Sequence, residues 1–232
     1  EKWISKTIQS LKNQSYKNFS CILIDDISSD NTYKVMLNSV ADDSRFTCVL
    51  NTEKKFALKN IIDGFATISS DSEDVLVTVD GDDWLADGGV LQKVADCYIK
   101  NNCLITYGSF VEYPSGQTHQ YFLSPYDKYT INNNLFRNVP WKASHLRTFK
   151  NKLWNKIDPK DLIDPATNKH YEVAWDLAFM FPMLEMAAER SQHIPDLLYV
   201  YNKENPLSDM YIKEQQQLAI ANLIRSKEKY KK

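Results

Sequence analysis

The sequence predicts an α/β fold in which a mixed, mostly parallel sheet carries helices on both faces. Short apolar runs alternate with amphipathic helical patterns over the first two thirds of the 232 residues, as strand–helix crossover units require. Two acidic clusters, Asp25-Asp26 and residues 80–83, directly follow such apolar runs. Ligands of folds with parallel strands bind beyond the carboxyl ends of the strands, so these clusters mark the expected site.

Strands and helices follow one another in a regular order. Apolar spacing predicts helices over residues 4–11, 33–40, 58–68 and 90–98. Short apolar runs predict buried strands at residues 19–24, 46–50, 75–79 and 104–110. The run at 75–79 is the clearest strand in the chain.

The later part of the chain is less regular. Residues 114–140 are polar, aromatic and weakly periodic, which indicates long loops or short edge strands. Apolar spacing then predicts a short helix over residues 146–157 and another over 173–188. A last strand is expected at 197–201, followed by a Lys- and Gln-rich helix from Ser208 to the end.

We expect one α/β domain over residues 1–205 and a helical extension over residues 206–232. The extension packs on the domain, pairs with another subunit or leads into a further domain. Sheets of this kind normally open on a central strand, whereas this chain opens on a helix at Glu1. The domain is therefore predicted to lack its first strand, which would lie ahead of Glu1.

Composition excludes several classes of protein. The 28 basic and 30 acidic residues give a net charge of −2, without the strongly basic face that nucleic-acid binding needs. No apolar run predicts a membrane span, and the polar first residues do not resemble a signal peptide. The four cysteines lack CxxC spacing and are expected as free thiols of a reducing compartment. The expected location is cytoplasmic, either free or peripheral to a membrane.

The loop Asp80-Gly81-Asp82-Asp83 carries the strongest chemical signal. Three carboxylates within four residues repel one another, which makes sense at a strand end if a divalent cation sits there. Mn²⁺ and Mg²⁺ prefer carboxylate and phosphate oxygens. Gly81 lets the backbone turn tightly and lets a ligand approach. The alternative is a solvated acidic turn, although helix capping would need one Asp rather than three.

Six segments with suggestive motifs occur in a set order along the chain. They are residues 10–19, 22–32, 57–60, 80–83, 174–176 and 198–202. Together they resemble the family 2 glycosyltransferases, which have the GT-A fold. Residues 22–32 look like the family's strand followed by an Asp-Asp turn, although Ile27 stands where the family has Gly. The family's Thr/Ser-Tyr-Asn turn after its first strand is absent.

The resemblance implies a nucleotide-sugar site. Asp26 matches the residue that hydrogen-bonds the nucleobase, typically uracil, and Lys59 matches a basic position beside the nucleotide. Asp80 and Asp82 match an Asp-x-Asp motif that contacts the donor ribose and binds the metal, Mn²⁺ or Mg²⁺. Asp83 then shares the ligation or fixes the loop. For Lys59, an ordinary exposed helix lysine is an equal alternative.

The resemblance also implies a catalytic base, which Asp176 matches. The family's usual Glu-Asp pair is Trp175-Asp176 here, and Glu172, four residues earlier, is the reserve candidate. The helix dipole would keep a base near a helix start ionised. Trp141, His145 and Trp175 are candidates for lining the acceptor or donor-sugar pocket. The alternatives are a helix carboxylate without a catalytic role and an ordinary core or surface histidine.

The expected reaction moves a sugar from a nucleoside-diphosphate donor, here a UDP-sugar, to an acceptor hydroxyl on a glycan, a lipid-linked sugar or a protein. Metal at Asp80 and Asp82 would stabilise the departing diphosphate, and Asp176 would take the acceptor proton. Inversion at the anomeric carbon is implied by the resemblance, and the C-terminal helix is a candidate for oligomerisation.

Other functions remain as alternatives. A glycosyltransferase-like module could bind a sugar or a partner without turnover, because the usual Glu-Asp pair is altered. An Asp-x-Asp phosphatase would place its nucleophile nearer the start of the domain. A dinucleotide-binding dehydrogenase is disfavoured because the chain has no GxGxxG motif.

Overall fold

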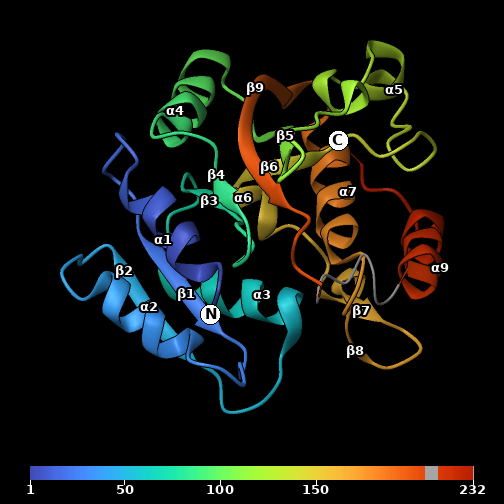
Figure 1. Ribbon diagram of the computed structural model, residues 1–232. Coiled ribbons are helices and arrows are strands. Elements are labelled where there is room, and N and C mark those ends of the chain that lie inside the picture. The colour runs from blue at the N-terminus through green and yellow to red at the C-terminus, as the bar shows by residue number, and fades with distance from the viewer. Residues whose placement is uncertain (207–213, 232) are drawn as a thin grey trace.

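The computed structural model describes residues 1–206 and 214–231 of the chain (Figure 1). The helices are α1 (Ile4–Lys12), α2 (Thr32–Val40), α3 (Phe56–Ile68), α4 (Val90–Asn101), α5 (Lys128–Asn132), α6 (Asn151–Trp154), α7 (Trp175–Ala187) and α9 (Glu214–Ser226). The strands are β1 (Cys21–Asp25), β2 (Phe46–Leu50), β3 (Val75–Val77), β4 (Trp84–Leu85), β5 (Ile105–Tyr113), β6 (Ser144–Lys150), β7 (Ile163–Asp164), β8 (Lys169–His170) and β9 (Ser191–Asn202). Short 3₁₀ turns are η1 (Gln120–Leu123), η2 (Pro159–Leu162) and η3 (Ala188–Arg190).

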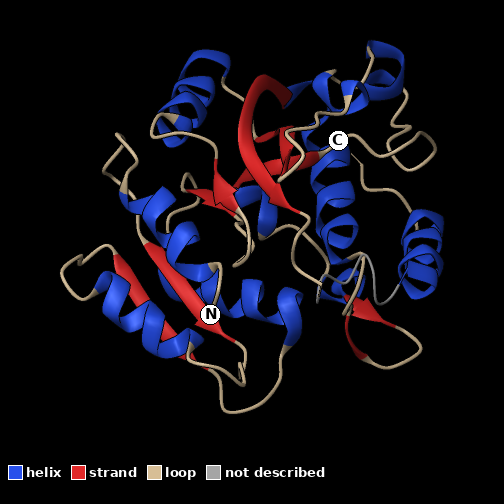
Figure 2. Ribbon diagram, viewed as in Figure 1, coloured by secondary structure: helices blue, strands red, loops and turns tan. Residues whose placement is uncertain are grey.

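The strands form a mixed α/β architecture, as predicted. β1 and β2 make a parallel pair, and a larger sheet has the order β3-β6-β5-β9-β4. The strands, red in Figure 2, lie between helices. The two longest ladders, β1–β2 and β5–β9, are parallel. β6 runs antiparallel to both β3 and β5, and β4 runs antiparallel to β9. β7 and β8 form a small separate hairpin.

Helices cover both faces of β1. Leu23 joins the core that α1, α2 and α4 share, whereas Ile22 and Ile24 line a pocket beside α3. Successive side chains of a strand point to opposite faces, so α2 and α3 lie on opposite sides of β1.

Helix α7 lies within the larger core. Every residue from Leu177 to Glu185 is buried, which is typical of a helix surrounded by protein. Phe149 of β6 packs against Phe179 of α7 and stacks on Trp154, with ring centroids 5.6 Å apart in each pair. The start of α7 is therefore held firmly against β6.

Residues 146–157 do not form the predicted helix. Residues 144–150 form β6, and the chain turns helical only in α6. Leu146, Phe149 and Leu153 have helical spacing, but β3 and β5 bond to β6 from both sides. Both faces of β6 are buried, which removes the polar alternation that identifies a strand in a sequence.

Other predicted segments differ in their extent. Residues 114–140 contain the short helical segments η1 and α5 rather than edge strands. β9 starts at Ser191, well before the predicted start at residue 197. The predicted C-terminal helix is present as α9, and its predicted part at 208–213 lies outside the described residues.

A buried ion pair holds the segment that follows α9. The side chains of Arg137 and Glu185 are 2% and 0% exposed, and Arg137 Nε donates to Glu185 Oε1 at 2.6 Å. Arg137 Nη1 donates to the carbonyl of Ile224, and the backbone N–H of Tyr230 donates to Glu185 Oε2. The described part of the C-terminal extension thus packs on the domain. None of the helices in residues 1–206 and 214–231 has the length and apolar character that a membrane span requires.

Candidate functional site

The acidic loop at 80–83 connects β3 to β4 and is fixed from two sides. On one side, the Thr7 hydroxyl of α1 donates to the carbonyls of Gly81 at 3.0 Å and Asp83 at 2.6 Å. On the other, the backbone N–H of Asp80 donates to the Tyr199 hydroxyl of β9 at 3.1 Å. The loop is therefore a rigid turn rather than a solvated one.

The end of β9 supplies further contacts to the same loop. The Asn202 N–H donates to Asp83 Oδ1 at 2.7 Å, and the Asn202 side chain donates to the Asp82 carbonyl at 3.0 Å. The Asn205 side chain donates to Asp82 Oδ2 at 2.7 Å. Asp82 is thereby turned toward Asn205, while Asp83 points into the protein.

Asp83 is the most perturbed carboxyl of the loop. It is 1% exposed, and burial together with the charges of Asp80 and Asp82 raises its pKa to about 8. Its Oδ2 accepts no hydrogen bond of good geometry from the described residues, although the Tyr199 hydroxyl is close enough to interact with the carboxyl. Burial thus favours the protonated, neutral form of Asp83, and a bound cation would offset the cost of ionising it.

His145 of β6 reaches the loop from the facing strand. Its Nε2 lies 3.6 Å from Asp80 Oδ2, and its ring stacks on Tyr199 at 4.5 Å between centroids. Burial and the charge of Arg147 lower the pKa of His145, which favours the neutral imidazole that metal ions bind. Burial would raise the pKa of Asp80, but His145 and Arg147 outweigh burial and lower it.

Arg147, two residues along β6, joins the loop region to α7. The Arg147 side chain is 6% exposed, and its Nη2 donates to Asp176 Oδ2 at 2.9 Å. Its guanidinium also lies 5.7 Å from the centre of the Trp175 ring. Asp176 is the second residue of α7, next to the partial positive charge of the helix start.

One group of side chains meets the geometry of a metal site. Ligand atoms of Asp80, Asp83 and His145 all lie within 4.8 Å of one another. Two carboxylates and an imidazole suit Mn²⁺, and the unpaired Oδ2 of Asp83 gives the cation a role in the fold. The residues present therefore fit a divalent cation. Asp82, which the family resemblance pairs with Asp80, is half-buried, and its Oδ2 accepts from Asn205.

The predicted nucleobase residue, Asp26, lies in the turn after β1. Its Oδ1 accepts from the Asn51 side chain at 2.7 Å and from the Lys55 N–H at 2.8 Å, and its Oδ2 accepts from the Phe56 N–H at 2.8 Å. Burial would raise the pKa of Asp26, but these hydrogen bonds outweigh it and lower the pKa to about 2. Asp26 thus ties the loop before α3 to the end of β1.

The remaining predicted residues take different places. Lys59 is paired with Asp63 one turn further along α3. Trp141 packs edge-on against Phe181 of α7, with centroids 5.1 Å apart. Trp175 lies beside Arg147. The structure therefore brings His145, Trp175 and Asp176 together with the acidic loop, while Trp141 contacts the core.

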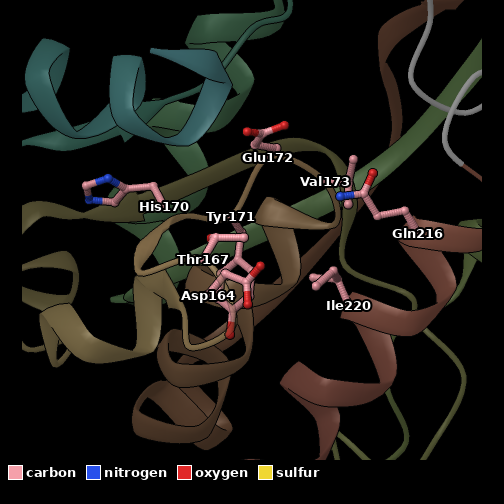
Figure 3. Close-up of a pocket in the computed structure, with 8 residues that line it drawn as sticks. All are labelled: Asp164, Thr167, His170, Tyr171, Glu172, Val173, Gln216 and Ile220. Carbon is pink, nitrogen blue, oxygen red and sulfur yellow. The ribbon is translucent and has the colours of Figure 1, made fainter.

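A pocket lies between the β7–β8 hairpin and α9, beside the residues that precede α7 in the sequence (Figure 3). It is formed by the β7–β8 hairpin, the segment leading into α7, and α9. The residues that line it are Asp164, Thr167, His170, Tyr171, Glu172, Val173, Gln216 and Ile220. Glu172, the reserve base candidate, is thus part of this pocket, and the lining is mostly polar without Lys or Arg.

From the sequence, no role is predicted for Arg147, and Tyr199 and Asn202 belong to the family-like segment 198–202 without a predicted contact to the acidic loop. Arg147 lies two residues from His145, and alternate residues share one face of a strand. The sequence does not reveal this shared face, because the apolar spacing of residues 146–157 predicts a helix rather than a strand. Tyr199 and Asn202 lie at the end of the last strand, but no sequence pattern links them to a loop more than a hundred residues away.

The sequence pattern of glycosyl transferase family 2 matches residues 1–158. The chain belongs to this family. A Campylobacter jejuni GalNAc(5)-diNAcBac-PP-undecaprenol beta-1,3-glucosyltransferase is 33% identical over 108 residues, which are 44% of this chain and 34% of that protein. An uncharacterized glycosyltransferase of Haemophilus influenzae is 28% identical over 112 residues, 47% of this chain and 42% of that protein.

Two solved structures have the same fold as this chain. S. aureus TarS in complex with UDP superposes with a TM-score of 0.63 at 15% identity, covering 98% of this chain and 63% of that one. The mannosyltransferase PcManGT from Pyrobaculum calidifontis, in complex with GDP-Man and Mn²⁺, superposes with a TM-score of 0.62 at 14% identity, covering 98% of this chain and 61% of that one. The fold is GT-A. The chain spans less than two thirds of the length of each of these four proteins.

Proposed function

We propose that this glycosyltransferase moves a sugar from a nucleoside-diphosphate donor, a UDP-sugar, to an acceptor hydroxyl with inversion. The observation that carries the proposal is the role of β6, which places His145 at Asp80 and Arg147 at Asp176. One strand thereby joins the acidic loop, where donor phosphates would lie, to the candidate base. We assign the transferase domain to residues 1–205 and its helical extension to 206–232.

Asp176 is the proposed general base. Its Oδ2 is held by Arg147, so the carboxylate has a fixed direction and Oδ1 is the atom that would accept the acceptor's hydroxyl proton. The hydroxyl oxygen would attack the anomeric carbon on the face opposite the diphosphate. Arg147 is a positioning residue, and the apolar packing of Trp175 beside it limits the access of water.

Asp80, Asp83 and His145 would hold Mn²⁺ or Mg²⁺, which when bound would offset the negative charge of the departing diphosphate. Asp82, which the family resemblance gives as the partner of Asp80, would contact the donor with Gly81. These roles follow from the convergence of the three ligand atoms and from the unpaired oxygen of Asp83. PcManGT with GDP-Man and Mn²⁺ supports a metal in a fold of this kind.

The donor assignment rests on Asp26 and on the structural relatives. TarS in complex with UDP and with UDP-GlcNAc supports a uridine nucleotide. Asp26 would accept from the base N–H in addition to its internal hydrogen bonds and its ion pair with Lys54. Lys59 would lie beside the nucleotide. The undecaprenol-linked compound in the name of the Campylobacter jejuni relative favours a lipid-linked glycan over a protein as the acceptor.

The test is thermal stabilisation by nucleoside diphosphates and sugar nucleotides, with and without Mn²⁺. A ligand at 100 times its dissociation constant should add about 2.7 kcal/mol of stability. We expect UDP or a UDP-sugar to stabilise the protein only with Mn²⁺, and Asp80→Asn to remove the effect. Asp42→Asn, at an exposed carboxyl paired with Lys12, is the matched control and should behave like the parent. Stabilisation by no nucleotide would contradict the proposal.

Turnover separates the enzyme from a binding module. Asp176→Asn should lower kcat for transfer by about 100- to 10,000-fold, the usual range for a general base, while nucleotide-induced stabilisation is retained. If the parent protein binds UDP-sugar with Mn²⁺ but neither transfers nor hydrolyses the sugar, the chain is a glycosyltransferase-like binding module instead.

A further inference from the structure

Two cysteines meet at the end of α4, outside the transferase site. Cys97 lies in the last turns of the helix and Cys103 follows directly after it. Between them Asn102 has left-handed backbone angles, φ 47° and ψ 39°, which end the helix and turn the chain back. Such a turn brings the residue after it over the last helical turn. The local backbone therefore sets Cys103 against Cys97.

The contacts confirm that the two sulfur atoms are neighbours. Cys103 Sγ donates to the Cys97 carbonyl at 3.8 Å, and its single S–H is close enough to interact with the Cys97 sulfur as well. The Asn101 side chain donates to Cys97 Sγ at 3.4 Å, which favours the thiolate form. A disulfide between Cys97 and Cys103 would close a short loop across the turn at Asn102.

The two thiols differ in access. Cys97 is partly exposed, whereas Cys103 is 3% exposed. The hydrogen bond from Cys103 lowers the pKa of Cys97 to about 6. A partly exposed thiolate next to a protected thiol is the arrangement in which one sulfur reacts with an oxidant and the other resolves the product.

We propose that Cys97 and Cys103 form a site of reversible thiol oxidation that closes to an internal disulfide. A peroxide is the oxidant: the Cys97 thiolate attacks one peroxide oxygen, forming a sulfenic acid and releasing hydroxide. The Cys103 sulfur then attacks the sulfenic sulfur, forming the disulfide and releasing water. Two electrons pass from the sulfur pair to the peroxide, and a dithiol reductant reverses the change.

The other two cysteines provide an internal contrast. Cys21 and Cys48 lie on the adjacent strands β1 and β2, but Cys21 faces Phe46 and Cys48 faces Leu23. Cys21 and Cys48 are therefore offset by two residues along the ladder rather than directly opposite each other. Burial raises the pKa of Cys21 to about 12 and also raises that of Cys48, so both stay protonated.

The experiment treats the full chain with hydrogen peroxide and maps its thiols by alkylation and mass spectrometry. We expect two of the four thiols to be lost, as one peptide pair linking Cys97 to Cys103, and to return with dithiothreitol. The double variant Cys21→Ser/Cys48→Ser is the matched control and should form the same link at the same rate.

Single variants separate the two roles. Cys103→Ser should leave a sulfenic acid at Cys97 that dimedone traps, and Cys97→Ser should leave Cys103 unreacted. Circular dichroism of each variant checks that the fold is retained, and Cys103→Ala replaces Cys103→Ser if the hydroxyl is not tolerated at this buried position. Oxidised parent protein in which Cys97 and Cys103 both remain free thiols, or are linked to Cys21, Cys48 or another chain, would overturn the proposal.

Discussion

The two acidic loops at the strand ends differ in how their carboxylates are satisfied. Asp26 accepts hydrogen bonds from Asn51, Lys55 and Phe56, and its pKa falls to about 2. Asp83 is deeper, keeps one oxygen without a well-formed hydrogen bond, and its pKa rises to about 8. Asp26 is therefore ionised near neutral pH, whereas burial keeps Asp83 mostly protonated unless a cation offsets its charge. Similar sequence motifs thus specify opposite electrostatic states.

The largest expected effect concerns the second loop. Asp83→Asn should weaken Mn²⁺ binding by at least about 100-fold, because even residues that only orient a ligand cost about 10- to 100-fold. Without Mn²⁺ the variant should be about as stable as the parent, because the raised pKa of Asp83 keeps the parent carboxyl mostly neutral at pH 7, as the amide is. Isothermal titration with Mn²⁺, alongside thermal unfolding, measures both.

Asp82→Asn is the matched variant for that prediction. It tests the metal pair Asp80 and Asp82, which the family resemblance implies, against the geometric grouping of Asp80, Asp83 and His145. Asp82→Asn should keep most of the Mn²⁺ affinity. The reverse result, a large loss of Mn²⁺ affinity for Asp82→Asn and none for Asp83→Asn, would favour Asp80 and Asp82 as the metal ligands.

The first loop should respond through stability rather than metal binding. Asp26→Ala leaves the Lys55 and Phe56 backbone N–H groups without their acceptor, at a cost of about 2 kcal/mol in the free energy of unfolding. Urea unfolding measures the change. Asp26→Asn keeps one acceptor oxygen and should lose less. Equal stability of Asp26→Ala and the parent would show that water replaces the carboxylate in this turn.

The Asp26 carboxyl should also make the free energy of unfolding depend on pH. The folded pKa of Asp26, about 2, lies below its ordinary value of 3.8, so its contribution is fully present above pH 4 and is lost as the pH falls toward 2. The stability difference between the parent and Asp26→Asn should shrink over that range by up to about 2 kcal/mol. Unfolding curves at pH 6, 4, 3 and 2 would show it. If the stability difference between the two proteins does not change with pH, the titration of Asp26 does not contribute to stability.

The smallest expected effect is a gain. Ile27 has φ 62° and is 45% exposed, and a β-branched residue in the left-handed region is strained by about 1 to 2 kcal/mol. Ile27→Gly should relieve that strain and raise stability by about 1 kcal/mol, after the larger entropy loss of Gly. Ile27→Ala keeps the Cβ atom and should gain little. Thermal unfolding of the two variants decides.

Much of the fold followed from the sequence because its strands and helices are locally encoded. The Val-rich strand β3 and the striped helix α3 carry their own patterns, and both form where predicted. β6 does not, because pairing with β3 and β5 overrides the helical spacing of Leu146 and Phe149. The same difference applies to the site: the sequence predicts the acidic loop, but it does not predict the role of Arg147.

The different roles of the three loop carboxylates also depend on contacts between residues far apart in the sequence. Asp80, Asp82 and Asp83 are equivalent in sequence, and only the contacts of Asn202 and Asn205 turn Asp83 inward and Asp82 outward. The ion pair between Arg147 and Asp176 joins a strand and a helix that are 29 residues apart, which no local pattern encodes.

The acidic loop depends on a strand that is made much later. The N–H of Asn202, 119 residues further along the chain, bonds Asp83. A ribosome adds about 5 to 20 residues each second, so the loop would wait on the order of 10 s for this partner during synthesis. Pairings of such long sequence separation also form slowly. A nascent chain is thus expected to expose its three carboxylates unassembled until β9 docks, so metal capture would follow folding rather than guide it.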